Sequence, residues 1–405
     1  MSSITLSAAT RQNLLSLQDT ASLMATTQNR LATGKTVNSA LDNPTNFFTS
    51  QALDSRSNGL NSLLDGVSNG VQAIQAANQG ITSIQKLVDQ AKSIANQALS
   101  TQLSTTGTAT NAYSTASSGS AVSFSVNGTT VTASASSSIT ATVAALNAAV
   151  AAQSTSSNGS FGAGAIFSTD STGTKIVLNA QADVEFQTTA SMTALGFATA
   201  SATALSSYNG VNTFASSDIA ISGVSQRKSL AQQYNNLLNQ ITQLAGDASY
   251  NGVNLIAGTG NDLKIKFNDT GSSNLDVASV DATASGLGLS AITSSNTPNS
   301  TSGAGLGNFL LNSDVNATLA TLTSAGSTLN SAASALGSNL SVVQNRQDFS
   351  KQLINVLQTG SANLTNADLN QEAANSQALS TRQSMGISAL SLANSAQQGV
   401  LQLLR

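Results

Sequence analysis

The most regular feature of the sequence is a set of apolar positions spaced alternately three and four residues apart. This spacing puts apolar side chains on one face of an α-helix and is typical of a coiled-coil seam. It predicts long helices near both ends of the chain and between them. The segments that carry it are residues 14–31, 60–98, 224–245, 315–357 and 389–403.

The two terminal segments have seams with little apolar width. Polar Gln28 even fills one seam position of the first segment. Isolated helices of this size are marginal in water, so each needs a partner, and the simplest partner is the other end of the chain. The terminal seams serve either as the core of a monomer or as contacts between copies. Their members are Leu14, Leu17, Ala21, Met24, Leu31, Ala389, Ala393, Ala396, Val400 and Leu403.

A second, longer pair of segments carries a more apolar seam. Residues 60–98 are predicted to form a helix about 58 Å long. Residues 315–357 form the matching segment, with Asp314 as its candidate N-cap. The seam positions expected to pack this rod are Ile74, Ile81, Ile84, Val88, Leu336, Leu340, Val343, Ile354 and Leu357.

The region between the helical segments has the alternation and turn residues of β-structure. Asn127-Gly128 predicts a two-residue hairpin turn between residues 121–126 and 129–132, because both turn positions need positive φ. Residues 138–152 predict a short helix, and residues 165–168 and 175–179 a second hairpin. Further on, Asn251-Gly252 predicts a third hairpin, residues 262–268 a half-buried strand, and residues 285–312 a loop.

These elements predict a mainly α fold. Its N- and C-terminal segments form a long antiparallel helical coiled coil or bundle with a β-hairpin, and a small α+β outer domain is inserted. The expected division is a terminal helical core of residues 1–45 and 359–405, a helical rod domain of residues 46–105, 210–284 and 313–358, a variable α+β outer domain of residues 106–209, and a Gly/Ser/Asn-rich loop of residues 285–312.

The low charge content limits the classes of partner that we expect the chain to bind. Charged residues make up 8% of the chain, against roughly 25% in an ordinary soluble domain. The net charge of −3 offers no basic patch, so no nucleic-acid partner is expected. No stretch reaches the roughly 18 apolar residues of a membrane span, so no membrane insertion is expected. The first residues lack the pattern of a secretory signal peptide, which predicts either a cytoplasmic protein or another export route.

The absence of cysteine and histidine narrows the chemistry. It excludes disulfides, zinc thiolate sites and Ser-His-Asp triads. Carboxylates such as Asp42, Asp89 and Glu372 are isolated in the sequence and are expected to face solvent or to lie at helix ends. No calcium-loop or phosphate-loop spacing occurs. We therefore expect no catalytic, cofactor-binding or metal-binding residues, and no enzyme.

Four short motifs, in order along the chain, resemble those of bacterial flagellins. Residues 29–44 resemble the segment that follows the first flagellin helix, residues 250–255 match the family's hairpin, Val343-Gln344-Asn345-Arg346 matches a motif of its long C-terminal helix, and residues 388–405 resemble its C-terminus. The resemblance covers roughly residues 1–105 and 215–405. Each motif alone is weak, but their order and their placement near both ends make the set specific.

The resemblance implies a structural subunit that polymerises with copies of itself into the flagellar filament for motility. It therefore favours the ten terminal seam residues as an assembly interface. It also implies type III export, an extracellular location in the filament, and an export chaperone, a distal cap protein and a hook–filament junction protein as partners. Two alternatives remain open, a hook–filament junction protein and a surface adhesin whose middle module binds glycan.

Two departures from the family pattern qualify the resemblance. The variable insertion lies before the helix expected at 224–245, whereas better-known flagellins carry it after the hairpin. In addition, Lys86 and Val88 stand where the family motif has arginines. That motif engages the innate immune receptor for flagellin, so the replacements put this recognition in doubt and suggest a flagellin of the alphaproteobacterial kind.

Overall fold

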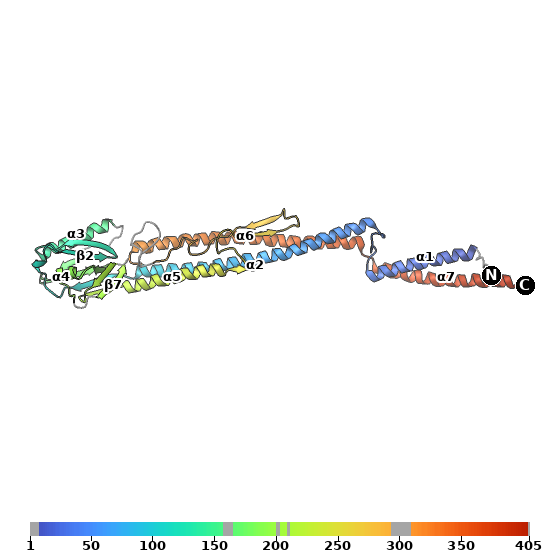
Figure 1. Cartoon of the computed structure of the whole chain (residues 1–405). Coiled ribbons are helices and arrows are strands. Elements are labelled where there is room, and N and C mark those ends of the chain that lie inside the picture. Colours follow the sequence, from blue (N-terminus) through green and yellow to red (C-terminus); the bar gives the residue numbers. More distant parts are fainter. Residues whose placement is uncertain (1–7, 157–164, 200–202, 209–210, 293–308, 404–405) are drawn as a thin grey trace. The chain divides into compact units, whose positions relative to one another are not determined.

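Long helices from both halves of the chain dominate the computed structural model (Figure 1), which describes residues 8–156, 165–199, 203–208, 211–292 and 309–403. The chain forms two compact units. One contains residues 1–68, 266–274 and 344–405, and the other contains residues 69–265 and 275–343. The long helices are α1 (Ala8–Thr33), α2 (Pro44–Ser100), α5 (Val224–Asp247), α6 (Asn312–Thr365) and α7 (Leu369–Leu403).

In the first unit, helix α1 lies beside α7 (Figure 1). Arg30 lies opposite Glu372, and Leu17 lies against Gly386, so the two helices are antiparallel. The same unit packs α2 against α6 through Leu60, Ile354 and Leu357. The prediction that the two ends of the chain pair as antiparallel helices is therefore confirmed.

A short connector joins α1 to α2 and is tied to the chain before α7. Gly34 ends α1 with a φ of 70°, a conformation that glycine adopts without steric cost. The Thr36 N–H donates to the Thr365 carbonyl at 2.7 Å, and the Ala367 N–H donates to the Gly34 carbonyl at 2.9 Å. The breaks in the two helical paths thus coincide and share backbone hydrogen bonds.

The second unit contains a closely packed three-helix arrangement. The structure buries Ile74, Ile81, Ile84 and Val88 of α2 almost completely. Buried residues of α5 and α6 recur at the same spacing as those of α2. In α5 they include Tyr234 and Leu238. In α6 they include Leu322, Leu329, Leu336 and Val343, whereas Leu340 is half-buried.

The start of α6 differs from the prediction. Asp314 does not cap this helix, because α6 begins at Asn312. The N–H groups of Asp314 and Val315 both donate to the Leu311 carbonyl at 3.2 Å, which extends the helix toward the N-terminus. Asp314 is instead buried in the first turn, where the helix dipole favours a negative charge.

Arg227 of α5 is a buried cation that holds together the ends of neighbouring segments. Its guanidinium donates to the carbonyls of Thr101, Phe309 and Leu310 and to Oδ1 of Asn312, at 2.9 to 3.2 Å. These acceptors lie just after α2 and at the beginning of α6. A buried guanidinium needs such partners to offset its loss of hydration.

Two antiparallel sheets follow α2 in the second unit (Figure 1). One has the strand order β4-β5-β1-β9 and the other β3-β2-β6-β8-β7. The strands are β1 (Ser104–Thr108), β2 (Ala121–Val126), β3 (Thr129–Ser134), β4 (Phe167–Thr169), β5 (Ile176–Ala180), β6 (Val184–Phe186), β7 (Thr203–Tyr208), β8 (Val211–Ala215) and β9 (Ile219–Ser222).

The first two predicted hairpins are confirmed. Asn127 and Gly128 have φ values of 47° and 84° and join β2 to β3, while β4 pairs with β5. The predicted helix is α3 (Ile139–Ser156), and a short helix α4 (Thr189–Ala194) was not predicted. A mixed apolar core that includes Phe124, Phe167 and Phe186 lies among these elements. Strands β1 and β9 extend beyond the predicted range 106–209.

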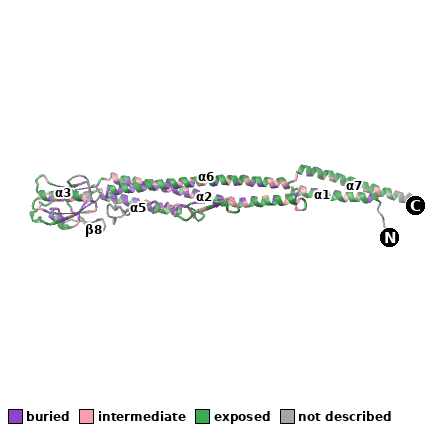
Figure 2. Ribbon diagram, turned by 90° about the horizontal axis from the view of Figure 1, so that it is seen from above, coloured by how far each residue is buried: buried purple, intermediate pink, exposed green. Residues whose placement is uncertain are grey.

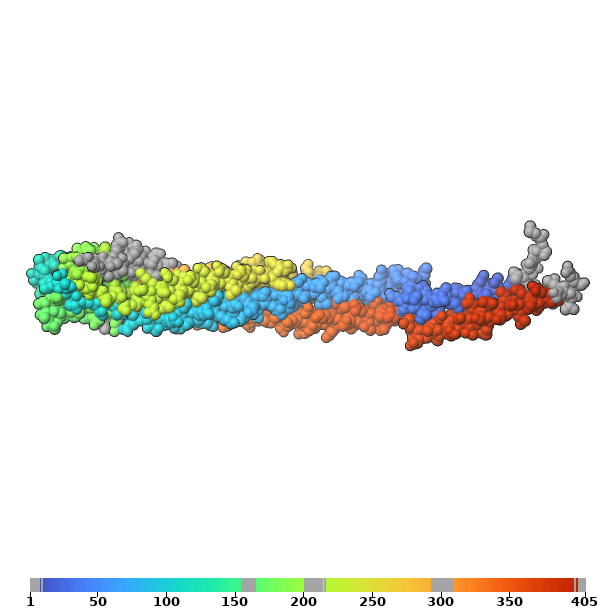
Figure 3. Space-filling view, turned by 90° about the horizontal axis from the view of Figure 1, so that it is seen from below, coloured from blue at the N-terminus to red at the C-terminus, as the bar shows by residue number. Residues whose placement is uncertain are grey.

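A chain of short strands follows α5. The predicted third hairpin is confirmed as β10 (Ser249–Tyr250) and β11 (Val253–Asn254), and β12 (Leu263–Lys266) pairs with β13 (Asn274–Val277). Figure 3 shows α5 and the segment after it lying against α2. Of the predicted loop 285–312, residues 293–308 lie outside the described residues, and Asn312 belongs to α6.

Two glycines of α2 make room for this segment in the second unit. A Cβ at Gly70 would lie 2.6 Å from Ile265 Cδ1, and a Cβ at Gly80 would lie 2.6 Å from Ala248 Cβ and 2.7 Å from Ile256 Cδ1. Such distances are too short for van der Waals contact. The absence of side chains at these two positions therefore sets how closely the segment approaches the helix.

Substitution of Gly80 by alanine tests this packing. We expect Gly80→Ala to lower the free energy of unfolding by about 1–3 kcal/mol through overpacking, which exceeds the roughly 1 kcal/mol that alanine gains over glycine inside a helix. Gly66→Ala is the matched control on α2, because a Cβ there meets nothing within 4 Å, and it should stabilise. Urea unfolding followed by circular dichroism measures both, and equal shifts of the same sign would contradict the packing argument.

Candidate assembly surface

The face that α1 turns toward α7 is polar. Its buried side chains are Thr10, Thr20 and Thr27, and Asn13, Leu17 and Met24 between them are half-buried. These positions are spaced three and four residues apart, so they form a coiled-coil seam with threonine in the most buried places. The facing residues of α7 are mostly small or polar; they are Glu372, Ser376, Leu379, Gln383, Gly386, Leu390 and Ala393.

The hydroxyl group of Thr20 is satisfied within its own helix. The Thr20 hydroxyl donates to the Ser16 carbonyl one turn earlier, at 2.8 Å. Each threonine therefore contributes one methyl group to the seam, against the roughly 1.5–3 kcal/mol of a fully buried leucine or isoleucine. The contact between α1 and α7 stabilises this helix pair far less than an aliphatic seam of equal length.

Most of the described large apolar side chains of this pair are exposed, whereas Leu17, Met24, Leu379 and Leu390 are half-buried in the seam. Leu15 is 64% exposed and Leu392 is 72% exposed, and Figure 2 shows α1 and α7 mostly in the colours of exposed and intermediate residues. Exposed apolar side chains that recur along an element mark an interaction surface. The large apolar residues exposed on these two helices are Leu14, Leu15, Leu23, Leu31, Leu369, Met385, Ile387 and Leu392.

The structure divides the predicted N-terminal seam between two faces. Leu17 and Met24 lie half-buried toward α7, whereas Leu14, Ala21 and Leu31 are exposed. A pattern search that counts only apolar residues misses the threonines, so it joins residues of two adjacent faces into one stripe. The spacing of Thr20 and Thr27, seven residues apart and three from Leu17 and Met24, is the signal that would have identified the inner face.

The predicted C-terminal seam is divided in a similar way. Ala393 is half-buried, and Ala389 and Ala396 are exposed. Val400 and Leu403 belong to α7, but their side chains lie outside the described residues. The predicted interface between copies thus stays a prediction, and its described members include both inward and outward positions.

An ion pair closes the seam at the connector end of the two helices. Arg30 Nη1 lies 3.5 Å from Glu372 Oε1, with Glu372 in the first turn of α7. Glu372 lies at a helix end, as expected, but it is 7% exposed and does not face solvent. Burial strengthens the attraction between the two charges but also costs hydration of the carboxylate, so the pair is not by itself evidence of added stability.

Asp42 organises the connector next to this ion pair. Its Oδ2 accepts the N–H groups of Asn38 and Ser39 at 3.0 and 2.9 Å. Both backbone hydrogen bonds lower the pKa of the Asp42 carboxyl below its ordinary value, and the bond from Ser39 has the larger effect. The chain then enters α2 through Asn43, whose side-chain oxygen accepts the Asn46 N–H at 3.1 Å, as an N-cap residue does ahead of a proline at the first helical position.

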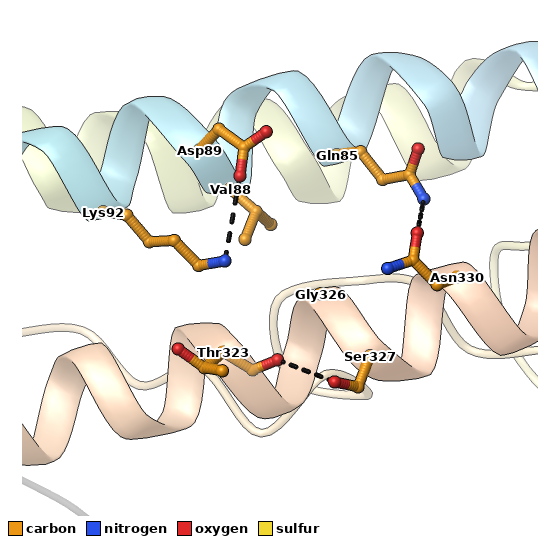
Figure 4. Close-up of a pocket in the computed structure, with 8 residues that line it drawn as sticks. All are labelled: Gln85, Val88, Asp89, Lys92, Thr323, Gly326, Ser327 and Asn330. Atoms are coloured by element: carbon orange, nitrogen blue, oxygen red, sulfur yellow. Dashed lines mark hydrogen bonds and ion pairs between the residues drawn. The ribbon is translucent and has the colours of Figure 1, made fainter.

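A polar hollow of about 380 Å³ lies between α2 and α6 in the second unit (Figure 4). Gln85 Nε2 donates to Asn330 Oδ1 across it at 2.8 Å. The ammonium group of Lys92 lies over Gly326, where a side chain would meet it. Among the described residues, Lys92 forms an ion pair only with Asp89, on its own helix, at 3.8 Å. The hollow contains no nucleophile paired with a base.

The described residues offer little else for chemistry or for membranes. No group of three or more Asp or Glu side chains comes together among them as metal ligands would. None of the helices, over the ranges that the structure covers, is long and apolar enough to span a bilayer.

Comparison with known families identifies both helical ends of the chain. Residues 3–118 match the family model described as the bacterial flagellin N-terminal helical region. Residues 319–404 match the model of the bacterial flagellin C-terminal helical region. The first match includes α1, α2 and β1, and the second includes most of α6 and all of α7.

Individual relatives come from two alphaproteobacterial genera. The chain is 34% identical to flagellin FljM of Caulobacter vibrioides over 176 residues, which cover 44% of this chain and 59% of the relative. It is 33% identical to flagellin FljO of the same organism over 191 residues, or 47% and 64%. It is 42% identical to flagellin A of Rhizobium meliloti over 77 residues, or 19% and 20%. The chain thus covers about three fifths of the length of FljM and of FljO.

Replacement of the seam threonines tests whether the seam limits the stability of the α1–α7 pair. We expect Thr20→Val with Thr27→Val to stabilise the pair by about 1 kcal/mol per substitution, because each adds a buried methyl group and removes a hydroxyl. Hydrogen exchange of α1 and α7 amides in dilute protein measures the effect as slower exchange. Thr26→Val, at an exposed position of the same helix, is the control, and equal protection in all three proteins would contradict the argument.

Proposed function

The chain belongs to the bacterial flagellin family, and on that premise we propose that it is a non-enzymatic structural subunit that polymerises with copies of itself into the flagellar filament for motility. The observation that carries this proposal is the helix pair α1–α7, which buries threonine and leaves most of its leucine, isoleucine and methionine side chains exposed. A helix pair of this kind gains most of its stability from contacts outside its own chain.

Energetics support contacts between copies. Fixing the backbone of one residue costs roughly 1–2 kcal/mol, and the polar seam offsets only part of that cost. Covering the exposed leucines with apolar side chains of other copies supplies about 25 cal/mol for each Å² removed from water. We therefore expect α1 and α7 to be poorly protected in the free subunit and ordered in the polymer.

A polymer of unlimited length needs contacts that do not close into a ring. A head-to-tail contact between two different surfaces of the subunit meets this condition. Apolar side chains occur on several sides of α1 and α7, so one helix pair offers more than one surface to its neighbours. The low charge content favours such packing, since copies with few charged residues repel one another little.

The remaining features of the proposal follow from family membership. We propose an extracellular location in the filament, export through the flagellar type III apparatus, and an export chaperone, a distal cap protein and a hook–filament junction protein as partners. The lack of cysteine is compatible with export of an unfolded chain, because disulfides would obstruct threading. We also propose three domains. Residues 1–45 and 359–405 form the terminal core, residues 46–105, 210–284 and 313–358 form the rod, and residues 106–209 form the outer domain.

Removal of the C-terminal part of α7 tests the function directly. Deletion of residues 386–405 takes away Ile387 and Leu392 of the exposed face together with half of the seam. We expect a soluble protein with the α2–α5–α6 helices folded and no ability to polymerise. Electron microscopy and sedimentation of seeded samples, with the full chain as control, measure this, and filaments of the truncated protein would refute the proposal.

Point substitutions on the outward face test the same surface more narrowly. Leu14 and Leu31 are 39% and 40% exposed, so Leu14→Asn with Leu31→Asn should leave the fold of the free subunit unchanged. We expect the critical concentration for polymerisation to rise at least tenfold, equivalent to about 1.4 kcal/mol per subunit added. Ser16→Asn with Ser22→Asn, at exposed polar positions of α1, is the matched control; if both double variants polymerise alike, the outward leucines are not at the interface.

A further inference from the structure

Glu372 has one buried carboxylate oxygen without a partner. Its Oε1 accepts from Arg30 Nη1 at 3.5 Å, a distance longer than that of a close ion pair. Its Oε2 is buried and has no hydrogen-bond partner among the described residues. An unsatisfied buried acceptor is costly, most of all when it is charged, so this oxygen calls for a donor.

A hollow of about 360 Å³ between α1 and α7 adjoins this carboxylate. It lies entirely within the unit that contains the two terminal helices. Leu23 on its rim is 53% exposed, so an exposed apolar side chain of α1 stands at the opening of the hollow. Its lining residues are Leu23, Thr27 and Arg30 of α1 and Glu372, Asn375, Ala378, Leu379 and Arg382 of α7.

The charges around the hollow restrict what it can bind. Two guanidinium groups, of Arg30 and Arg382, would repel an added cation. An added carboxylate would have no hydrogen to donate to Glu372 and would be repelled by it. A neutral carboxamide meets both needs, because its NH₂ group donates to Glu372 Oε2 while its oxygen accepts from Arg382. Arg382 has no ion pair in the described part of the chain.

Access to Oε2 requires the carboxylate to turn, because the oxygen is covered. Rotation about the last torsion of Glu372, which has broad, shallow preferences, moves both oxygens together, so Oε2 reaches the hollow only as Oε1 leaves its present place. Arg30 is half-buried and can follow the carboxylate. The stem of the incoming side chain then packs on Leu23 and Leu379, which are the apolar walls.

We propose that this hollow binds the carboxamide side chain of a glutamine or asparagine from α1 or α7 of a second copy of this chain. This inference rests on the proposed polymerisation and names one contact within it. Two observations favour a second copy: the rim carries the exposed apolar side chain of Leu23, and the helix pair exposes many carboxamides. Those on α1 and the described part of α7 include Gln12, Gln18, Gln28, Asn29, Gln371, Gln377, Asn394 and Gln398.

Two substitutions alter the hollow by different means. Glu372→Gln keeps the size of the side chain but can turn an N–H toward the incoming NH₂ group, and Ala378→Leu fills the hollow without touching the ion pair. We expect each to raise the critical concentration for polymerisation at least tenfold, measured by sedimentation after seeding. Asp19→Asn is the control, because it removes the same charge from an exposed position on α1 and should polymerise like the unsubstituted chain.

The possible outcomes separate this inference from the proposed function. If the unsubstituted chain forms no filaments, the proposed function is wrong, and the proposed contact is wrong as well. If the unsubstituted chain polymerises and Ala378→Leu does so with the same critical concentration, the hollow is unoccupied in the filament and the inference is wrong, whatever Glu372→Gln does. Normal polymerisation of Glu372→Gln alone would likewise overturn the role of the carboxylate.

A cross-linking measurement identifies the occupant. The chain has no cysteine, so Asn375→Cys gives a single thiol on the wall of the hollow, to which a benzophenone maleimide can be attached. In filaments mixed from labelled and isotope-marked unlabelled chains, we expect cross-links to α1 or α7 peptides of the marked copy at a glutamine or asparagine. Cross-links confined to the labelled chain itself would contradict the proposal.

Discussion

The rest of this molecule depends on one constraint, which is the free-energy cost of ordering two long helices against each other. The cost matters here because threonine lines the face between these helices. A coiled-coil seam normally offsets backbone entropy by burying leucine and isoleucine. In the α1–α7 pair the buried seam positions of α1 are Thr10, Thr20 and Thr27, and most of the described leucines are exposed. The free energy needed to hold these helices is therefore only partly available inside one chain, and in the proposed filament the balance comes from other copies.

The α2–α5–α6 helices of the second unit show the opposite arrangement. Their seams bury isoleucine, valine and alanine almost completely, and Gly70 and Gly80 admit the side chains of the segment after α5 at short distances. Buried apolar area and close packing stabilise this part within one chain. One sequence thus contains helices that are stable alone and helices that depend on neighbours. The filament subunit that we propose needs both, because it must keep its shape and still respond to the end of a growing polymer.

The sequence predicted the second kind of seam more accurately than the first. Ile74, Ile81 and Ile84 are apolar, regularly spaced and buried, so periodicity alone locates them. The hairpin at Asn127-Gly128 was predictable because its turn requires positive φ at both residues. Threonine is counted as polar in such a search, so the inner face of α1 was missed and Leu14 and Leu31 were joined to Leu17 and Met24.

Several strands could not be predicted because their stability comes from distant partners. Strand β1 lies between β5 and β9, and β6 lies between β2 and β8. Strand β1 is rich in serine and threonine, and β6 has only three residues, all of them buried, so neither shows a clear alternation of its own. Which face of such a strand is buried depends on pairings up to about a hundred residues away in the sequence, and no local pattern records them.

Scarcity of charge makes shape the main source of specificity between the helices. Charged residues are 8% of the chain, and of the ion pairs described only Arg30–Glu372 joins two long helices. Exposed leucines on a weakly charged surface would otherwise bind any apolar partner. A buried charge that needs one particular donor restricts that choice, because a neighbour in the wrong position leaves Glu372 unsatisfied. The ion pair then serves less to stabilise α1–α7 than to select the position at which another copy can pack, which is the role that single polar residues have in coiled-coil seams.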